Sequence, residues 1–73
     1  MRLGTYLSSL TKPELVELEE LLNLTDDELP VFQGLAKGRS KTRIAGDNII
    51  SIGTVNNRIK SINTKIERIL REV

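Results

Sequence analysis

The chain contains no cysteine and no histidine among its 73 residues. Without cysteine it has no disulfide framework and no thiolate metal site, and without histidine it lacks the commonest general base and metal ligand. No run of about 18 apolar residues predicts a membrane span, and the N-terminus lacks a secretory apolar core. We expect a cytoplasmic protein with no membrane partner and no cofactor.

Catalysis is not expected either. The usual pairs of a nucleophile and a general base need histidine or cysteine, and no phosphate-binding glycine loop is present. The acidic side chains lie at positions that suit helix caps and exposed helix surfaces. We therefore expect no enzyme and no metal site. These acidic side chains are Glu17, Glu19, Glu20, Asp26, Asp27 and Glu28.

The net charge of +1 conceals two halves of opposite sign. Residues 1–36 have two basic and seven acidic side chains, a balance of −5, whereas residues 37–73 have nine and three, a balance of +6. This asymmetry favours a polyanionic partner for the basic half. The alternative is two ordinary solvated surfaces whose charges attract each other.

Two segments, LTKPEL (10–15) and LTDDEL (24–29), have the same arrangement of residues. In each, a threonine lies three residues before a glutamate, as in a capping box, and two leucines flank the pair as a hydrophobic staple. The boxes predict helices that run to about Asn23 and to about Lys37. Pro30 falls just past the expected first turn of the second helix, where it would remove a hydrogen bond or bend the helix.

Two shorter helices are also expected. Residues 2–10 have leucines at helical spacing, and Ser40 can cap a helix that runs through Ala45. Residues 46–49 then predict a turn, in which Asn48 can adopt the left-handed conformation. Because no strand pattern is long enough to persist, we expect an all-α fold.

The last helix begins after a capping residue, Ser51, and can extend to Val73. Its apolar residues step by three and four, which places them in one stripe. The opposite side is small, amide-rich and basic. Such a helix can pack on its own domain while its outer side reaches base edges in a DNA major groove. The stripe consists of Ile52, Val55, Ile59, Ile62, Ile66, Ile69 and Val73, and the outer side of Gly53, Asn56, Asn57, Lys60 and Thr64.

Residues 24–66 follow a longer pattern without a gap. It comprises a Leu-Thr-x-x-Glu helix start, a core helix with a glycine stop, a supporting helix, a turn, and a recognition helix that closes with Ile-x-x-Lys-Ile. The matched residues are Leu24, Thr25, Glu28, Val31, Phe32, Leu35, Ala36, Gly38, Ser40, Ile44, Ala45, Ile50, Ser51, Thr54, Val55, Ile62, Lys65 and Ile66. This pattern resembles the helix-turn-helix DNA-binding domain of the LuxR type, which is closely related to sigma-factor region 4.

The resemblance implies one domain over residues 1–73, a small all-α bundle of about four helices with a long C-terminal recognition helix. Residues 24–66 would be the helix-turn-helix core, residues 1–23 an N-terminal helical extension, and residues 67–73 a helix extension. The chain departs from the family in the turn, where Asn48 and Ile49 replace the usual Leu and Gly. It also lacks the short fourth helix of LuxR proteins, its recognition helix is expected to continue instead, and an extra helix precedes the motif. In these respects it resembles a minimal standalone transcriptional regulator, of the kind that phages and mobile elements encode.

On this resemblance, the start of the recognition helix reads bases and the supporting helix binds phosphates of double-stranded DNA. Asparagine can bond adenine, lysine can reach guanine, and isoleucine can meet a thymine methyl group. The base-contact candidates are Ile52, Gly53, Asn56, Asn57 and Lys60; Ile52 could instead belong only to the core. The phosphate-contact candidates are Arg39, Ser40, Lys41, Thr42, Arg43, Ser51 and Thr54, and the alternative for the basic ones is a solubilising turn.

The apolar stripe continues beyond the helix-turn-helix core, so something must cover its end. One option is the same helix of a second copy, which gives a homodimer that reads two half-sites; the other is the N-terminal leucines of the same chain. We favour the homodimer because so short a chain needs extra burial. The candidate dimer seam is Ile62, Ile66, Ile69, Leu70 and Val73.

Two other functions remain open. The seam could dock on another protein, such as RNA polymerase or a phage assembly component, with the basic charge incidental. A nonspecific packaging or architectural DNA-binding protein is the third possibility. A shallow salt dependence of duplex binding would favour the protein-docking function.

Overall fold

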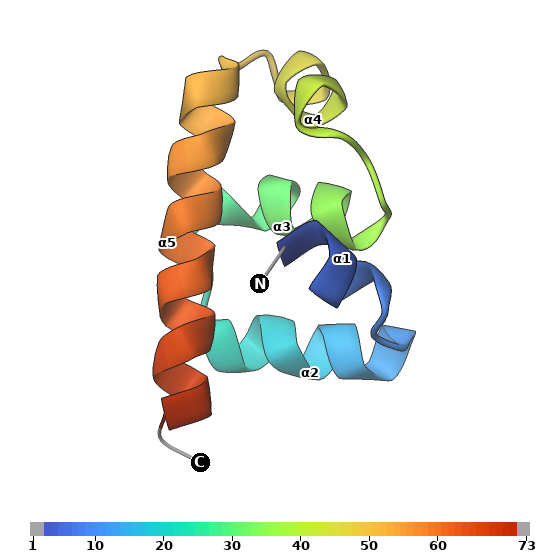
Figure 1. The fold of residues 1–73 in the computed structure, drawn as a ribbon, viewed down its shortest axis with the longest axis vertical. Coiled ribbons are helices and arrows are strands. Elements are labelled where there is room, and N and C mark those ends of the chain that lie inside the picture. Colours follow the sequence, from blue (N-terminus) through green and yellow to red (C-terminus); the bar gives the residue numbers. More distant parts are fainter. Residues whose placement is uncertain (1–2, 72–73) are drawn as a thin grey trace.

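The computed structural model describes residues 3–71, which form five α-helices and no strand (Figure 1). Each of the five helical segments expected from the residue pattern has a helix, whereas the expected bundle was of about four helices. The all-α prediction is confirmed. None of the helices in this part of the chain has the length and apolarity that crossing a membrane requires. The helices are α1 (Leu3–Ser8), α2 (Lys12–Leu22), α3 (Glu28–Ala36), α4 (Lys41–Asn48) and α5 (Ile52–Arg71).

Helix α5 runs along one side of the molecule, and the other helices are stacked beside it (Figure 1). α4 packs beside the N-terminal end of α5, α3 against its middle, and α2 toward its C-terminal end. α1 packs on α3. At about 1.5 Å per residue, the 20 residues of α5 span about 30 Å, close to the longest dimension of the Cα trace, 35 Å.

Both expected capping boxes are present. The N–H of Glu14 donates to Thr11 Oγ1 at 3.3 Å and the N–H of Thr11 donates to Glu14 Oε1 at 2.9 Å; Thr25 and Glu28 repeat the exchange at 3.2 and 3.0 Å. α3, however, begins only at Glu28. The N–H of Leu29 donates to Thr25 O at 3.0 Å, so the next bond of this ladder would have to come from Pro30, which has no N–H. The late start of α3 is consistent with the hydrogen bond that we expected Pro30 to remove.

The end of α3 follows the glycine stop that the sequence predicts. Gly38 is left-handed, with φ of 78°. Its N–H donates to Leu35 O, and the N–H of Arg39 donates to Gly34 O, both at 3.0 Å. These two bonds form a Schellman motif, which satisfies carbonyl groups at the end of the helix.

The turn expected over residues 46–49 is wrong, because α4 continues through Asn48. The side chain of Asn48 donates from Nδ2 to Ile44 O at 2.8 Å within the helix, rather than forming a turn. The left-handed residue is Ile49, with φ of 54°. The N–H of Ile50 donates to Ala45 O at 3.0 Å, so the motif that ends α3 recurs at the end of α4.

The hydrophobic core joins α1 to α5. On α5, Val55, Ile62 and Ile66 are at most 1 % exposed, which confirms the inward side of the predicted stripe. The N-terminal leucines Leu3 and Leu7 are buried in the same cluster. The remaining buried apolar residues are Leu22, Val31, Phe32, Leu35, Ile44 and Ala45.

Candidate nucleic-acid interface

The N-terminal half of α5 presents a solvent-exposed polar side. The buried Val55 fixes the rotation of this half of the helix about its axis. Ile52 is 47 % exposed and lies outside the core cluster, so the alternative that it serves only the core has no support. All five base-contact candidates are exposed on this helix: Ile52, Gly53, Asn56, Asn57 and Lys60.

The start of α5 is held by the hydroxyl groups of Ser51 and Thr54. The N–H of Thr54 donates to Ser51 Oγ at 3.1 Å, and the two hydroxyl oxygens are 2.8 Å apart. This is the N-cap expected of Ser51. Both phosphate-contact candidates therefore already have a local partner, although a hydroxyl group that makes these bonds retains further hydrogen-bonding capacity.

Two of the basic candidates on and before α4 converge on one carboxylate. Arg39 Nη1 and Arg43 Nε lie 3.6 and 3.7 Å from Asp47 Oδ2, and the N–H of Arg43 donates to Ser40 Oγ at 3.1 Å. The side chains of Arg39, Asp47 and Arg43 are 36, 48 and 64 % exposed. Solvent-exposed pairs of this kind contribute little to stability, so the arginines can exchange Asp47 for another anion at low cost.

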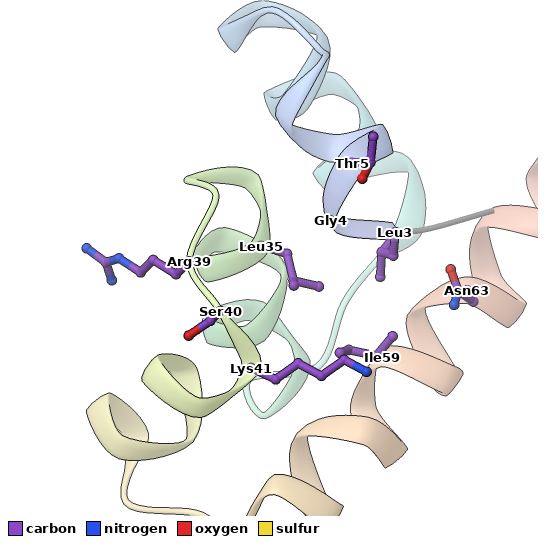
Figure 2. Close-up of a pocket in the computed structure, with 9 residues that line it drawn as sticks. All are labelled: Leu3, Gly4, Thr5, Leu35, Arg39, Ser40, Lys41, Ile59 and Asn63. Carbon is purple, nitrogen blue, oxygen red and sulfur yellow. The ribbon is translucent and has the colours of Figure 1, made fainter.

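Lys41 lies apart from the two arginines. Its side chain extends across a pocket of about 560 Å³ toward Ile59 on α5. Arg39 and Ser40 also line this pocket, but their side chains point away from Ile59 (Figure 2). The same pocket is lined by Asn63, whose Oδ1 is buried without a hydrogen-bond partner among residues 3–71. The structure thus divides the basic phosphate-contact candidates into an arginine pair and a lysine beside α5, and the side chain of Thr42 is exposed.

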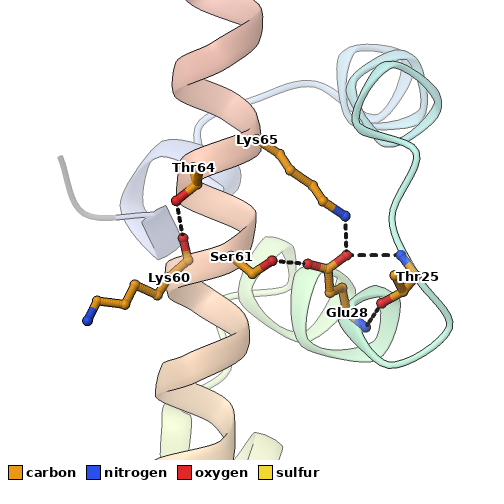
Figure 3. Close-up of polar contacts among 6 residues, drawn as sticks. All are labelled: Thr25, Glu28, Lys60, Ser61, Thr64 and Lys65. Atoms are coloured by element: carbon orange, nitrogen blue, oxygen red, sulfur yellow. Dashed lines mark hydrogen bonds and ion pairs between the residues drawn. The ribbon is translucent and has the colours of Figure 1, made fainter.

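Glu28 links the start of α3 to the middle of α5 (Figure 3). Its side chain is buried, and it accepts hydrogen bonds from the Ser61 hydroxyl, the Lys65 ammonium and the Thr25 N–H. Burial alone would raise the pKa of Glu28, but the bonds from Lys65, Ser61 and Thr25 outweigh it and lower the pKa from 4.5 to about 2. Lys60 extends from the other side of α5, away from this cluster (Figure 3).

Acidic and basic side chains gather on different helices. Residues 39–60, which include α4 and the first half of α5, have five basic side chains and one acidic side chain. Helix α2, at the opposite end in Figure 1, has four acidic side chains and one basic side chain. The second half of α5, which lies toward α2, has three basic side chains and one acidic side chain, so basic charge continues along α5 and is greatest in number around α4 and the first half of α5. A polyanion would be attracted to the α4–α5 surface and repelled from α2.

Most of the candidate dimer seam is covered by the chain itself. Ile62 and Ile66 are 0 and 1 % exposed, and Ile69 is partly buried against the core. Their burial is the intramolecular alternative considered from the sequence: α2 and α3 pack on α5, and the N-terminal leucines Leu3, Leu7 and Leu22 belong to the same core cluster. Leu70 alone of the described seam residues is well exposed, at 57 %, and Val73 lies outside the described residues.

Two features of the site were missed from the sequence. Ser61 and Lys65 bond Glu28 from 33 and 37 positions away, and no local pattern indicates so distant a pairing. Ile49 is left-handed and 93 % exposed. A signal for Ile49 was present, because it occupies the turn position where the resembled family usually has glycine.

No protein-family model matches the chain, and neither a curated protein nor a solved structure matches it significantly. Within residues 3–71, no group of three or more acidic side chains is arranged to hold a metal ion. A function for the α4–α5 surface must therefore be inferred from its own geometry and charge.

Proposed function

We propose that this protein is a sequence-specific DNA-binding transcriptional regulator with a LuxR-type, sigma-factor region 4-like helix-turn-helix. One observation supports this most strongly. The helix α5 buries Val55, Ile62 and Ile66 of its apolar stripe in its own domain and leaves all five base-contact candidates exposed, beside the basic helix α4. A helix that enters the major groove must meet both of these requirements.

The arrangement of α4 and α5 suits this role. The two helices pack on each other and are joined by only three residues, 49–51. α5 lies at the edge of the molecule along its whole length (Figure 1). Its first half can therefore enter a groove about 12 Å wide, while α4 remains at the phosphate backbone.

Each base-contact candidate on α5 would have a partner in the groove. Asn57 would bond the N6 and N7 atoms of adenine, and Lys60 would donate to guanine. Gly53 would let the helix backbone approach the bases closely because it has no Cβ atom. The fold itself has room for one, since a Cβ atom at this position would meet only Ser51 Oγ, at 3.8 Å. Asn56 and Ile52, which lie next to each other on one side of this row, would complete the contacts.

The basic groups around α4 would anchor the protein on phosphates. Arg39 and Arg43 would exchange Asp47 for phosphate oxygens, and Lys41, Ser40 and Thr42 would contact the adjoining backbone. Each cation that neutralises a phosphate releases counterions, so binding should weaken steeply with salt. This part of the surface contributes affinity and orientation but little sequence preference.

The regulator is proposed to act as a homodimer. Because Ile62 and Ile66 are buried, the contact between copies would use Leu70 and the end of α5 rather than the whole seam. The same burial weakens the alternative of a docking module for RNA polymerase or a phage assembly component, since it was to use the same seam. A protein-docking function would require a different surface.

The test begins with selection of bound duplexes from a random library by the purified chain. Binding of the selected duplex and of a scrambled duplex is then measured by fluorescence anisotropy between 50 and 200 mM salt. We expect the selected duplex to bind at least about 10³-fold more tightly than the scrambled one, with affinity falling steeply with salt.

Asn57→Ala and Lys60→Ala should each reduce the preference for the selected duplex by about 10-fold or more without changing helicity or melting temperature. Lys12→Ala, an exposed lysine on the acidic helix α2, is the matched control and should leave binding unchanged. Undiminished preference in both α5 variants would refute the assignment of this side of the helix. Equal binding of all duplexes would indicate an architectural DNA-binding protein, and no binding at 50 mM salt would refute a DNA-binding function.

A further inference from the structure

Ile49, in the turn between α4 and α5, combines two unfavourable features. Its side chain is 93 % exposed, and its backbone is left-handed, with φ of 54°. A β-branched residue in this conformation is strained, because its Cβ lies too close to the following carbonyl oxygen. Burial does not compensate, since the side chain packs on almost nothing in the isolated chain.

The end of α3 also requires a left-handed residue, and there the chain has a glycine, which adopts this conformation without strain. There the left-handed position of the Schellman motif is Gly38, and the next N–H bonds back to Gly34 O at 3.0 Å. At the end of α4 the equivalent position is Ile49, and the N–H of Ile50 bonds back to Ala45 O at the same distance. Glycine would satisfy the backbone here too, so folding does not account for the isoleucine.

The surroundings of Ile49 indicate what would cover it. It is followed three positions later by Ile52, which is 47 % exposed at the start of α5. The turn joins α4, which begins beside a pair of arginines, to the half of α5 that ends with Lys60. An apolar protein partner would have to bury these cations, whereas DNA neutralises them with phosphates. The apolar group that DNA presents in its major groove is the 5-methyl group of thymine.

We propose that Ile49 is a specificity-determining residue that, together with Ile52, reads the 5-methyl groups of thymine. This inference rests on the proposed function. In the complex, the exposed side chain of Ile49 would be buried against one or two methyl groups at the edge of the site. The strain of the left-handed isoleucine is retained because glycine or asparagine, which fit the backbone, would lose that contact.

The test separates reading of methyl groups from folding. The selected duplex is compared with copies in which single thymines are replaced by deoxyuridine, which removes only the 5-methyl group. For the wild-type chain we expect a loss of about four-fold for each methyl group that an isoleucine covers. Ile49→Asn should lower the affinity for the thymine duplex and abolish the discrimination at one thymine, and Ile49→Val should largely retain both.

Substitutions of Ile49 that weaken DNA binding should not lower the stability of the fold. Ile49→Gly and Ile49→Asn relieve the left-handed strain, so we expect melting temperatures equal to or above that of the wild type, by up to about 4 °C. Leu21→Asn, at a residue 61 % exposed on α2, is the control and should leave DNA affinity unchanged. Higher stability with weaker, methyl-blind binding supports the inference.

The failures are distinguishable. Sequence-selective binding with no deoxyuridine effect at any thymine, or with an unaltered effect in Ile49→Asn, overturns the role of Ile49 and leaves the proposed function intact. Absence of sequence-selective binding by the wild type overturns the proposed function, and the role of Ile49 with it.

Discussion

Lys65 on α5 donates a hydrogen bond to the buried carboxylate of Glu28, which begins α3 37 positions earlier in the chain. The contact joins the first turn of one helix to the middle of another and so restricts the rotation of α5 about its axis. Because Lys60 lies on the other side of the same helix, this restriction also determines which residues face the solvent (Figure 3). A structural ion pair thereby orients the proposed recognition surface.

Replacing Glu28 should destabilise the fold substantially. Glu28→Gln leaves the Lys65 ammonium without its counter-ion in a partly buried position, and we expect a loss of about 2–3 kcal/mol in the free energy of unfolding, measured by urea denaturation. The control is Glu14→Gln, in the equivalent but fully exposed capping box of α2, which should have a much smaller effect. Equal losses in the two variants would show that the contribution of Glu28 is that of a cap alone.

Glu28 should also make stability depend on pH in the acid range. Its pKa is lowered from 4.5 to about 2 in the folded chain, so the unfolded chain binds a proton first as pH falls. The stabilisation is therefore complete above about pH 5 and is lost progressively between about pH 4.5 and pH 2. The difference in melting temperature between wild type and Glu28→Gln should shrink across this window. A difference that stays constant from pH 6 to pH 2.5 would contradict the assignment.

Of the contacts of Glu28, the sequence predicted those with Thr25 and not those with Ser61 and Lys65. A threonine three residues before a glutamate identifies a capping box, because its two hydrogen bonds lie within one turn. The bonds from Ser61 and Lys65 depend on how α3 packs on α5, which no short window of sequence determines. The apolar stripe of α5 was recognised from its spacing. Whether Ile62 and Ile66 are covered by a second copy or by the N-terminal leucines of the same chain also depends on helix packing, and the sequence did not determine it.

The turn before α5 shows a different limit. Asn48 was expected to be left-handed because asparagine tolerates that conformation better than isoleucine. In the structure the side chain of Asn48 instead bonds the carbonyl of Ile44 and extends α4 by a further turn, which shifts the left-handed position to Ile49. The hydrogen bond of Asn48 thus overrides its intrinsic preference for the left-handed conformation, which falls instead on Ile49, the residue for which we propose a functional contact.

Two helical glycines should respond in opposite ways to the same substitution. A Cβ atom at Gly34 on α3 would lie 2.8 Å from Cγ1 of the buried Ile44, so α3 and α4 would have to separate. We expect Gly34→Ala to destabilise the protein by about 1–2 kcal/mol despite the better helix propensity of alanine. At Gly46 on α4 a Cβ atom would meet nothing within 4 Å among the described residues, so Gly46→Ala should stabilise by about 0.5–1 kcal/mol. Thermal denaturation of the pair measures both, and a stabilising Gly34→Ala would contradict the close packing of α3 on α4.

Asp47 should restrain DNA binding. Its carboxylate lies 3.6 and 3.7 Å from Arg39 and Arg43, where it competes with phosphate for both cations. Asp47→Asn keeps the size of the side chain and removes the charge, so we expect about 3- to 10-fold tighter binding of any duplex at low salt, with the preference between duplexes unchanged. Anisotropy titrations with the selected and the scrambled duplex measure both quantities. Weaker binding by Asp47→Asn would mean instead that the carboxylate positions the two arginines for their contacts.

The proposed homodimer depends on Leu70, since Ile62 and Ile66 are already buried within one chain. Light scattering of the wild type should give the mass of a dimer at micromolar concentrations, and Leu70→Glu should give that of a monomer with unchanged helicity. Leu21→Glu is the control, because Leu21 is as exposed, at 61 % against 57 %, but lies on α2. A dimer that separates into monomers should also lose affinity for a duplex with two half-sites, because each half-site is then bound independently. A wild-type chain that is monomeric both alone and on the selected duplex would leave the apolar stripe of α5 with a purely intramolecular role, and one chain would then read one site.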